Sequence, residues 1–310
     1  MITTPMDVLR QFPVRKTKKQ KRAFRDAVQS YAQSLGYKTK IEKGKFGLHN
    51  IVIGDPETAR YLVTAHYDTP AGLWVPNLMV PCNLVLFILS QILITLAVIA
   101  PPIILSVLTA WLLPETMVWY FVLLGGLYLS IALMLFGPAN RHNANDNTSG
   151  VVTLLETAAS MPENLRDRVC FVLFDLEELG MVGSSFHRKK HKYASNLQTV
   201  LNLDCVGDGN HILFIPDKRV KREEKLLRRL IDLERCCGEK RVQVRDKGFA
   251  FFPSDQKVFP RGVGICALHK NKLCHYCGRI HTFRDTILDY TNVNILRACL
   301  ISFIGGAAEE

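Results

Sequence analysis

The sequence predicts an α/β protein in which a mainly parallel, mixed sheet is flanked by helices, with an inserted α-helical transmembrane hairpin. Short apolar runs of strand length alternate with amphipathic runs of helix length over most of the 310 residues. A long and almost uncharged apolar block interrupts this alternation between residues 70 and 140. Ionisable residues repeatedly stand directly after the predicted strands, which is where open α/β sheets bind their ligands.

The first part of the chain combines a basic helix with two strands. Residues 18–35 predict a basic amphipathic helix, and residues 50–54 and 60–65 predict strands separated by a Gly-Asp-Pro turn. Residues 1–40 hold ten Lys and Arg side chains against two Asp side chains. Such an excess suggests an anionic partner, either a nucleic acid or a membrane surface, and a solvated basic face is the alternative.

The apolar block predicts membrane-spanning helices. From Pro70 to Asn140 the only side chain with a formal charge is Glu115. The segment Met117–Phe136 matches the roughly 20 apolar residues that one span needs. The segment Leu84–Leu113 is longer, and its central Pro pair should break or kink it. Neither segment shows the polar stripe of a soluble core helix, so we expect two spans, with one or three as the alternatives.

After this block the alternation resumes. The expected strands and helices are strands at 169–175, 199–203 and 264–268, and helices at 150–160, 182–192, 218–236 and 292–304. The run from Val169 to Phe174 is continuously apolar, as expected for a strand that is covered on both faces.

Candidate ligands for a metal pair stand beside these elements. They comprise two imidazoles and several carboxylates, found after four strands and before one helix: His66, Asp68, Asp146, Glu177, Glu178, Asp204 and His281. A single strand-end histidine or a pair of adjacent glutamates would be weak evidence alone. Together, two imidazoles and three carboxylates can hold two zinc ions that share one carboxylate.

At these positions the sequence resembles the co-catalytic two-zinc aminopeptidases, metallopeptidase family twenty-eight, which also contains carboxypeptidase-like and glutaminyl cyclase-like members. The matching motifs occur in the family's order: AHYDT (65–69), NDNTSG (145–150), EELGMVGS (177–184), NLD (202–204), SDQKVF (254–259) and HTFRDT (281–286). The resemblance implies a zinc exopeptidase-like three-layer fold. It also implies a discontinuous peptidase domain, 1–69 and 141–310, with residues 70–140 as the inserted hairpin.

The resemblance also assigns a role to each candidate. His66 and Asp204 would bind one zinc ion, Glu178 and His281 the other, and Asp146 would bridge the two. Asp68 would orient His66, and Glu177 would act as general base. The implied function is that of a membrane-anchored zinc exopeptidase, in the first instance an aminopeptidase. The alternatives are glutaminyl cyclisation or deacylation at the same site, or a catalytically inactive membrane scaffold.

Two features near the C-terminal motif depart from the family pattern. Many members carry a Tyr directly before the final His, where it stabilises an oxyanion. Ile280 occupies that position here, and Tyr276 is the nearest possible substitute. Cys274 and Cys277 have a C-x-x-C spacing, for which a third, structural zinc and a loop with two free thiols are the competing interpretations.

The candidate site constrains the membrane topology. If His66 and Asp146 hold the same metal pair, they lie on one side of the membrane and the number of crossings between them is even. Two spans then anchor the chain in the cell membrane. The basic domain, the nine scattered cysteines and the absence of a signal-like apolar stretch in residues 1–40 favour the cytoplasmic face. The expected partners are a peptide substrate and the lipid bilayer, and no motif supports nucleic-acid binding.

Overall fold

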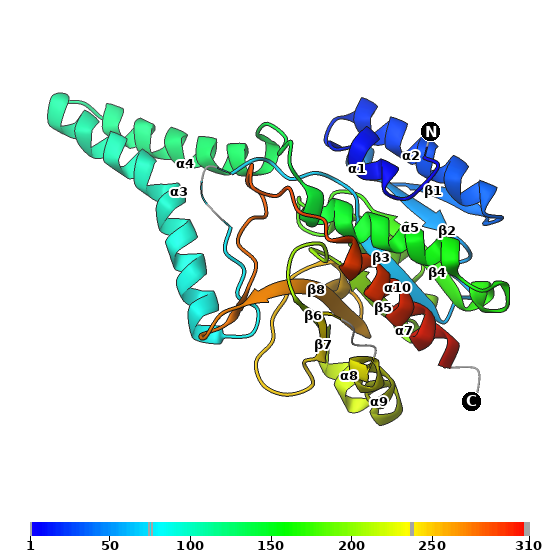
Figure 1. The fold of residues 1–310 in the computed structure, drawn as a ribbon. Helices are drawn as coiled ribbons and strands as arrows, with labels where there is room; N and C mark the ends of the chain where they lie inside the picture. Colours follow the sequence, from blue (N-terminus) through cyan, green and yellow to red (C-terminus); the bar gives the residue numbers. More distant parts are fainter. Residues whose placement is uncertain (1, 74, 76, 236–238, 307–310) are drawn as a thin grey trace.

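A mixed nine-stranded sheet lies at the centre of the protein in this computed structural model, which describes residues 2–73, 75, 77–235 and 239–306 (Figure 1). Its main path has the order β1-β2-β4-β3-β5-β8-β6-β7, and β9 pairs with β8. The strands are β1 Thr39–Lys43, β2 His49–Ile53, β3 Tyr61–His66, β4 Val169–Phe174, β5 Thr199–Leu203, β6 His211–Pro216, β7 Arg241–Val244, β8 Gly262–Lys270 and β9 His275–Tyr276.

The parallel strands form the middle of this sheet. β3 runs parallel to β4 on one side and to β5 on the other, and β5 runs parallel to β8. The hairpin of β1 and β2 joins β4 in antiparallel fashion, and β6 is antiparallel to β8. The carboxyl ends of β3, β4 and β5 therefore meet at one edge of the sheet, where a ligand site is expected.

Helices cover both faces of the sheet, in agreement with the predicted layered architecture. They are α1 Asp7–Gln11, α2 Lys18–Ser34, α5 Gly150–Ser160, α6 Val182–Lys190, α7 Lys192–Leu197, α8 Lys218–Arg222, α9 Glu224–Asp232 and α10 Tyr290–Gly305. Alternate residues of β4 enter different cores. Phe171 packs with residues of α2, α5 and α10, whereas Phe174 faces the other core and contacts the His187 ring of α6.

Local sequence explains where α2 begins and which face it buries. The Thr17 hydroxyl accepts a hydrogen bond from the Gln20 backbone N–H, and the Gln20 side chain accepts one from the Thr17 N–H. This capping box satisfies two N–H groups that the first helical turn leaves free. Phe24, Val28 and Tyr31 then recur at helical spacing and are buried against the sheet.

The apolar block forms two helices that project from the sheet domain: α3 Leu84–Leu112 and α4 Val118–Phe136 (Figure 1). Both are long and apolar enough to cross a membrane, by length and composition. Figure 1 shows that α3 bends along its length. Pro101 and Pro102 lie inside this helix, and proline is the usual cause of such a bend. We call α3 and α4 the helical hairpin below.

The two stems of the insertion lie side by side at its base. Ala71 and Ala139 form an antiparallel bridge, and the Gly72 N–H donates to the Pro138 carbonyl at 2.9 Å. The chain therefore leaves the sheet domain and returns to it at nearly the same point.

Several predicted elements have different bounds in the structure. The helix expected over 218–236 is broken at Glu223, whose backbone angles of φ −89° and ψ 89° are not helical, so α8 and α9 are separate. Residue 236 lies outside the described residues. The helix expected over 182–192 ends at Lys190. Strands β1, β6, β7 and β9 were not predicted. β1 has the sequence TKIEK, whose charges hide its strand character, and it lies at an edge of the sheet.

Candidate metal centre

The structure brings the candidate ligands together at the carboxyl edge of the parallel strands. His66 is the last residue of β3, Glu177 and Glu178 stand in the loop after β4, and Asp204 directly follows β5. Asp146 lies in the irregular turn before α5, and His281 lies in the loop between β9 and α10. His66, Asp146 and Asp204 are buried. The structure therefore places these six side chains at one edge of the sheet.

Asp146 lies between two groups of side chains. Its Oδ1 is 3.2 Å from His66 Nε2, which in turn is 3.7 Å from Asp204 Oδ1. Its Oδ2 is 2.9 Å from His281 Nε2, which is 3.6 Å from Glu178 Oε2. Each oxygen of one carboxylate thus faces a different imidazole and a different second carboxylate.

The backbone beside these side chains is unusual. Leu176, Cys205 and His281 have φ values of 59°, 55° and 59°, a left-handed conformation that residues with a side chain rarely adopt. Leu176 directly precedes Glu177, Cys205 directly follows Asp204, and His281 is itself a candidate ligand. Such conformations cost of order 1–3 kcal/mol each and concentrate at functional sites.

Asp68 supports the loop that carries the two glutamates. Its Oδ1 accepts a hydrogen bond from the Glu177 N–H at 3.0 Å, and its Oδ2 lies 3.3 Å from the Glu178 N–H. Its Oδ1 is also 3.6 Å from His66 Nδ1. The predicted orienting role toward His66 remains a proposal, whereas the contact with the glutamate loop was not anticipated.

Asp285 is a further residue that sequence analysis did not assign. Its two oxygens accept hydrogen bonds from the Asn145 and Asp146 N–H groups at 2.7 and 3.0 Å. It lies in the motif HTFRDT, four residues after His281, so its place in the motif was the available signal. Asp285 thereby holds the turn that presents Asp146 to both groups.

Asp255, in the motif SDQKVF, is a second unassigned acid. It is fully buried, and neither of its carboxylate oxygens has a hydrogen-bond partner within the described part of the chain. Burial raises the pKa of Asp255 to about 7. Asp255 therefore adds another buried acidic side chain to those around the site.

Acidic groups outnumber cationic ones in this buried region. Burial raises the pKa of Glu178 to about 8, and the Asp146 carboxylate contributes to the increase. Burial likewise raises the pKa of Glu177 well above its usual value. Burial lowers the pKa of His281, but the Glu178 and Asp146 carboxylates outweigh it and raise this pKa to about 9. Crowded buried carboxylates need compensating positive charge.

The residues present fit a pair of divalent ions. Three groups of potential ligands converge here within the described chain: His66 with Asp146 and Asp204, Asp146 with Glu178 and His281, and His66 with Glu177 and Glu178. The first two groups share Asp146. Two ligands of a tetrahedral zinc ion are separated by roughly 3.3 Å, given bonds of about 2.0–2.1 Å. The measured separations of 2.9–3.7 Å agree with that spacing. Asp204 Oδ1 is buried without a hydrogen-bond partner, as expected for an atom reserved for a metal.

A small cavity of about 190 Å³ adjoins these side chains. Phe252 and Pro253 form part of its wall, and Ile280 lies beside His281. Asn77 and Met79, which belong to the first stem of the insertion, also line it. The backbone of Met79 pairs with that of Cys277, and the Leu73 N–H donates to the His281 carbonyl at 2.8 Å, so the stem forms part of the site.

The structure places the remaining candidates away from the cavity. Tyr276 does not line it, and its ring lies 5.7 Å from that of His269. Cys274 and Cys277 are free cysteines, and neither belongs to a metal-ligand group in the described part of the chain. Cys277 instead lies 3.6 Å from Asn145 Nδ2.

Comparison with known proteins places this geometry in context. The sequence model of Peptidase family M28 matches residues 130–301, which include every candidate ligand except His66. No curated protein matches the chain. Similar solved structures include Porphyromonas gingivalis glutaminyl cyclase (18% identity; 98% of this chain and 97% of that chain; TM-score 0.62). A Zn-dependent exopeptidase from Parabacteroides distasonis is also similar (16% identity; 95% of this chain and 93% of that chain; TM-score 0.60). The Legionella pneumophila LapA aminopeptidase is a third similar structure (15% identity; 99% of this chain and 72% of that chain; TM-score 0.61). These likenesses show a shared zinc exopeptidase-like α/β fold.

Proposed function

Since the chain belongs to peptidase family M28, we propose that it is a membrane-anchored, zinc-dependent exopeptidase, in the first instance an aminopeptidase. The observation that carries this proposal is the position of Asp146, whose two oxygens face His66 at 3.2 Å and His281 at 2.9 Å. A carboxylate in that position suits two metal ions rather than one.

The proposed ligand sets follow from these distances. His66 and Asp204 would hold one zinc ion, Glu178 and His281 the other, and Asp146 both. When bound, the zinc pair would supply Lewis acidity, which lowers the pKa of water and polarises a carbonyl group. The surplus of buried carboxylates around the site would be neutralised by these ions.

Glu177 is the proposed general base. It is adjacent to Glu178 and lines the same cavity, but it is not needed for either bridged ligand set. It would accept a proton from the attacking water and deliver that proton to the departing amine.

Asp68 would fix the loop so that Glu177 and Glu178 perform different tasks, because it accepts hydrogen bonds from both of their backbone N–H groups.

The cavity supports action at a chain end. Its volume of about 190 Å³ is below the range of about 300–1,000 Å³ that is typical of ligand pockets. A terminal residue fits such a space better than the middle of a long peptide. Met79, Phe252 and Ile280 give the cavity an apolar part that would pack against the terminal side chain.

Glutaminyl cyclisation is a second candidate function. A solved glutaminyl cyclase has the same fold over 98% of this chain, and Ile280 leaves the cavity without the family's oxyanion-stabilising Tyr at that place. In that reaction the substrate's own α-amine attacks the γ-carbonyl of its glutamine side chain, and ammonia leaves. Glu177 would transfer the proton from the amine to the departing ammonia.

A substrate screen tests these proposals. The full chain, purified in detergent and supplied with zinc, would be assayed on aminoacyl peptides, N-acetylated peptides and peptides with N-terminal glutamine. Release of the first residue from free-amine peptides alone supports the aminopeptidase. Loss of ammonia with retention of the peptide would identify the cyclase. No turnover of any substrate by a zinc-loaded, folded chain would favour the inactive scaffold.

We also propose that the helical hairpin crosses the cell membrane twice. At about 1.5 Å per residue, α4 is roughly 28 Å long, close to the hydrocarbon core of about 30 Å. α3 is longer, at roughly 43 Å, and its bend accommodates the excess. Only 11% and 6% of the most apolar stretches of α3 and α4 are buried in the protein.

The sheet domain is proposed to face the cytoplasm. The basic N-terminal segment lies near the base of α4, since Lys16 Nζ is 3.5 Å from the Leu135 carbonyl. Lys16, Lys18 and Arg22 line a common surface with Phe46, whose side chain is 93% exposed. Cations and an exposed aromatic ring beside a spanning helix suit the anionic cytoplasmic leaflet.

Cysteine labelling tests this topology. A membrane-impermeant maleimide on intact cells should label Glu115→Cys, at the tip of the hairpin, above the level of the parent chain. Lys189→Cys, on the sheet domain, should react only after the cells are opened. The reverse pattern would place the catalytic domain outside the cell.

A further inference from the structure

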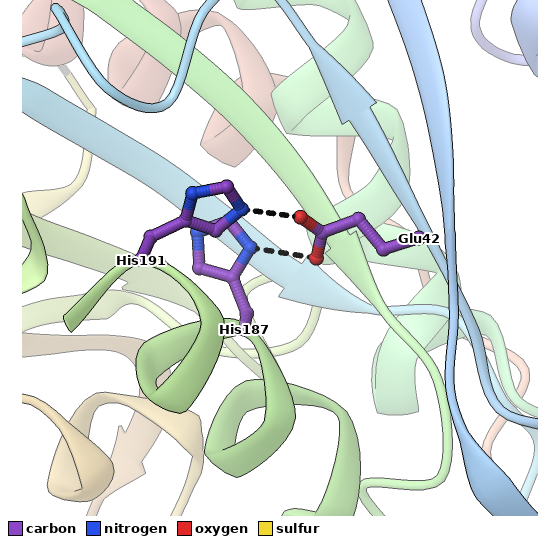
Figure 2. A group of neighbouring side chains, drawn as sticks. All are labelled: Glu42, His187 and His191. Atoms are coloured by element: carbon purple, nitrogen blue, oxygen red, sulfur yellow. Dashed lines mark hydrogen bonds and ion pairs between the residues drawn. The ribbon is translucent and has the colours of Figure 1, made fainter.

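A second group of potential metal ligands lies outside the candidate centre. Glu42 of β1, His187 of α6 and His191 at the C-terminal end of α6 converge between the strand and the helix (Figure 2). All three are buried, with exposed fractions of 1%, 0% and 7%. Their potential ligand atoms lie within 4.8 Å of one another, and the group shares no residue with the candidate peptidase centre.

The local fold positions the two histidines for joint binding. His187 and His191 stand four residues apart in the sequence HRKKH, and the His191 N–H donates to the His187 carbonyl at 2.9 Å. Residues at this spacing lie on the same side of a helical turn. Their ring centroids are 4.7 Å apart, and each ring directs one nitrogen toward Glu42 (Figure 2). His187 Nδ1 is 2.9 Å from Glu42 Oε2, and His191 Nε2 is 2.5 Å from Glu42 Oε1.

The position of protons distinguishes a hydrogen-bonded cluster from a metal site. His191 contacts carboxylates through both nitrogens: Nε2 contacts Glu42, and Nδ1 contacts Glu57. Without a metal ion, both contacts are hydrogen bonds only if the ring or one of the two carboxylates holds an additional proton. With an ion beside Nε2, the neutral ring suffices, because Nδ1–H then donates to Glu57. A ligating histidine typically donates its other N–H to a carboxylate in this way.

The surroundings of His187 leave Glu42 as its polar contact. Its ring is fully buried beside the aromatic side chains of Phe174 and Phe259. Its Nε2 has no hydrogen-bond partner among the described residues. The polar contact of this imidazole within the described residues is therefore the one between Nδ1 and Glu42 Oε2.

We propose that Glu42, His187 and His191 bind a divalent transition-metal ion, in the first instance zinc, at a site distinct from the peptidase centre. Two imidazoles and a carboxylate are ligands that zinc accepts, and water or the second Glu42 oxygen completes the coordination. Glu57 orients His191 from outside. Because α6 follows the Glu177–Glu178 loop, the ion would tie the helix behind that loop to the edge strand β1. The role is structural, since the ligands are buried.

Lys190 provides a way to separate the two interpretations. Its Nζ lies 3.4 Å from Glu42 Oε1, and its side chain is 34% exposed, so it can turn toward solvent. In a metal-free cluster Lys190 is a partner of Glu42, and Lys190→Gln would destabilise the protein. At a metal site Lys190 competes with the ion for the same oxygen, and Lys190→Gln would bind zinc at least as tightly.

Metal content is the primary test. The full-length chain with Asp146→Ala, which disables the shared ligand of the peptidase centre, would be dialysed against zinc and then against buffer. It should retain about one zinc per chain at the site of three ligands. Adding His187→Gln or His191→Gln should remove that ion, whereas adding His49→Gln, a control at another histidine, should not. Equal metal content in all of these variants would overturn the proposal.

A spectroscopic measurement covers the case in which the histidine variants fail to fold. X-ray absorption of the zinc-loaded Asp146→Ala chain should show two imidazole ligands together with oxygen ligands. Zinc should also raise the midpoint of thermal unfolding of this chain, and more so with Lys190→Gln. A zinc shell without imidazole, or a lower midpoint for zinc-loaded Lys190→Gln, would mean that the cluster is held by hydrogen bonds alone. Because peptidase activity is not measured, these outcomes are independent of the proposed function.

Discussion

The sheet domain and the helical hairpin distribute their side chains in opposite ways. In the sheet domain, strands β3 and β4 are buried along their whole length, and ionisable side chains gather at one edge. In the hairpin, the buried residues of the helices are Ser90, Pro102, Ser106 and Ser130, while large apolar side chains such as Leu129 are exposed. The first pattern is favourable in water, and the second is favourable where the surroundings are as apolar as the side chains.

This contrast teaches that the two regions require different driving forces. Burial of apolar surface stabilises the sheet domain. Close contact between small residues stabilises the hairpin, where the Ser106 hydroxyl donates to the Trp119 carbonyl at 2.9 Å. The same kind of substitution should therefore have different consequences in the two regions. Four experiments examine the sheet domain, the hairpin and the junction between them.

The largest effect is expected in the sheet domain, at the ionisable edge. Glu177→Gln should lower kcat by roughly 10²–10⁴-fold, because the variant side chain cannot accept the proton of the attacking water. Both zinc ions should remain bound, since Glu177 is outside the two bridged ligand sets. Metal analysis beside a peptidase assay measures both quantities. Glu163→Gln, at an exposed position, is the matched control, and retained activity of Glu177→Gln would remove it as the general base.

The next effect compares one exposed leucine from each region. Leu129 of α4 and Leu197 of α7 are 59% and 57% exposed. Leu129→Arg should disfavour membrane insertion by about 2.5–3.5 kcal/mol, the cost of an Arg near the centre of a spanning helix. Leu197→Arg should change stability by only about 0.5 kcal/mol. Membrane fractionation and protein yield measure the difference. Equal tolerance at both positions would argue that α4 does not enter the membrane.

A smaller effect is expected inside the hairpin. A Cβ atom at Gly126 would lie 2.6 Å from the Pro102 Cβ, whereas one at Gly125 would meet nothing within 4 Å. Gly126→Val should therefore separate α3 from α4 and cost about 1–3 kcal/mol through overpacking. Gly125→Val is the neighbouring control. Thermal unfolding in detergent should show a lower midpoint for Gly126→Val only, and equal midpoints would mean that this helix contact contributes little.

The smallest effect concerns pH at the junction of the two regions. His275 precedes Tyr276, which lines an apolar pocket with residues of α3. Burial lowers the pKa of His275 to about 4, and the nearby cationic groups His211, Lys270 and Arg245 contribute. The folded state therefore disfavours the protonated imidazole. This contribution to stability is complete above the unfolded pKa of about 6.5 and is lost as the pH falls toward about 4.

His275→Gln should weaken that loss. Denaturant unfolding at a series of pH values would show a shallower decrease in the free energy of unfolding between pH 6.5 and 4 for the variant than for the parent chain. His142→Gln, at an exposed histidine, should follow the parent chain. An unchanged slope for His275→Gln would contradict the assignment.

The sequence was informative wherever a local pattern determines long-range geometry. Parallel strands share one edge, so residues that follow them, such as His66 and Asp204, could be grouped before their contacts were known. The bounds of β5 and α5 were predicted without error. Strand β6 was missed although its residues are buried, because the sequence HILFIP is short and ends in Pro.

Contacts between distant polar residues could not be predicted from the sequence. Asp285 accepts hydrogen bonds from backbone N–H groups about 140 positions earlier, and no sequence periodicity predicts such a contact. Glu42 likewise meets His187 and His191, which stand 145 and 149 positions later in the chain. The spacing of the two histidines is visible in HRKKH, but their carboxylate partner stands in a charged strand that was itself not predicted.

The first stem of the insertion limits which segments can be exchanged between this protein and a relative. Asn77 and Met79 line the cavity, and the stem backbone pairs with the segment that carries His281. A cut that removed residues 70–140 as a unit would take part of this wall away, whereas a cut between Asn83 and Gly137 would spare it. The insertion and the cavity therefore share the residues of the first stem, so exchanging residues 70–140 as a whole would alter the cavity wall, whereas exchanging the two helices alone would not.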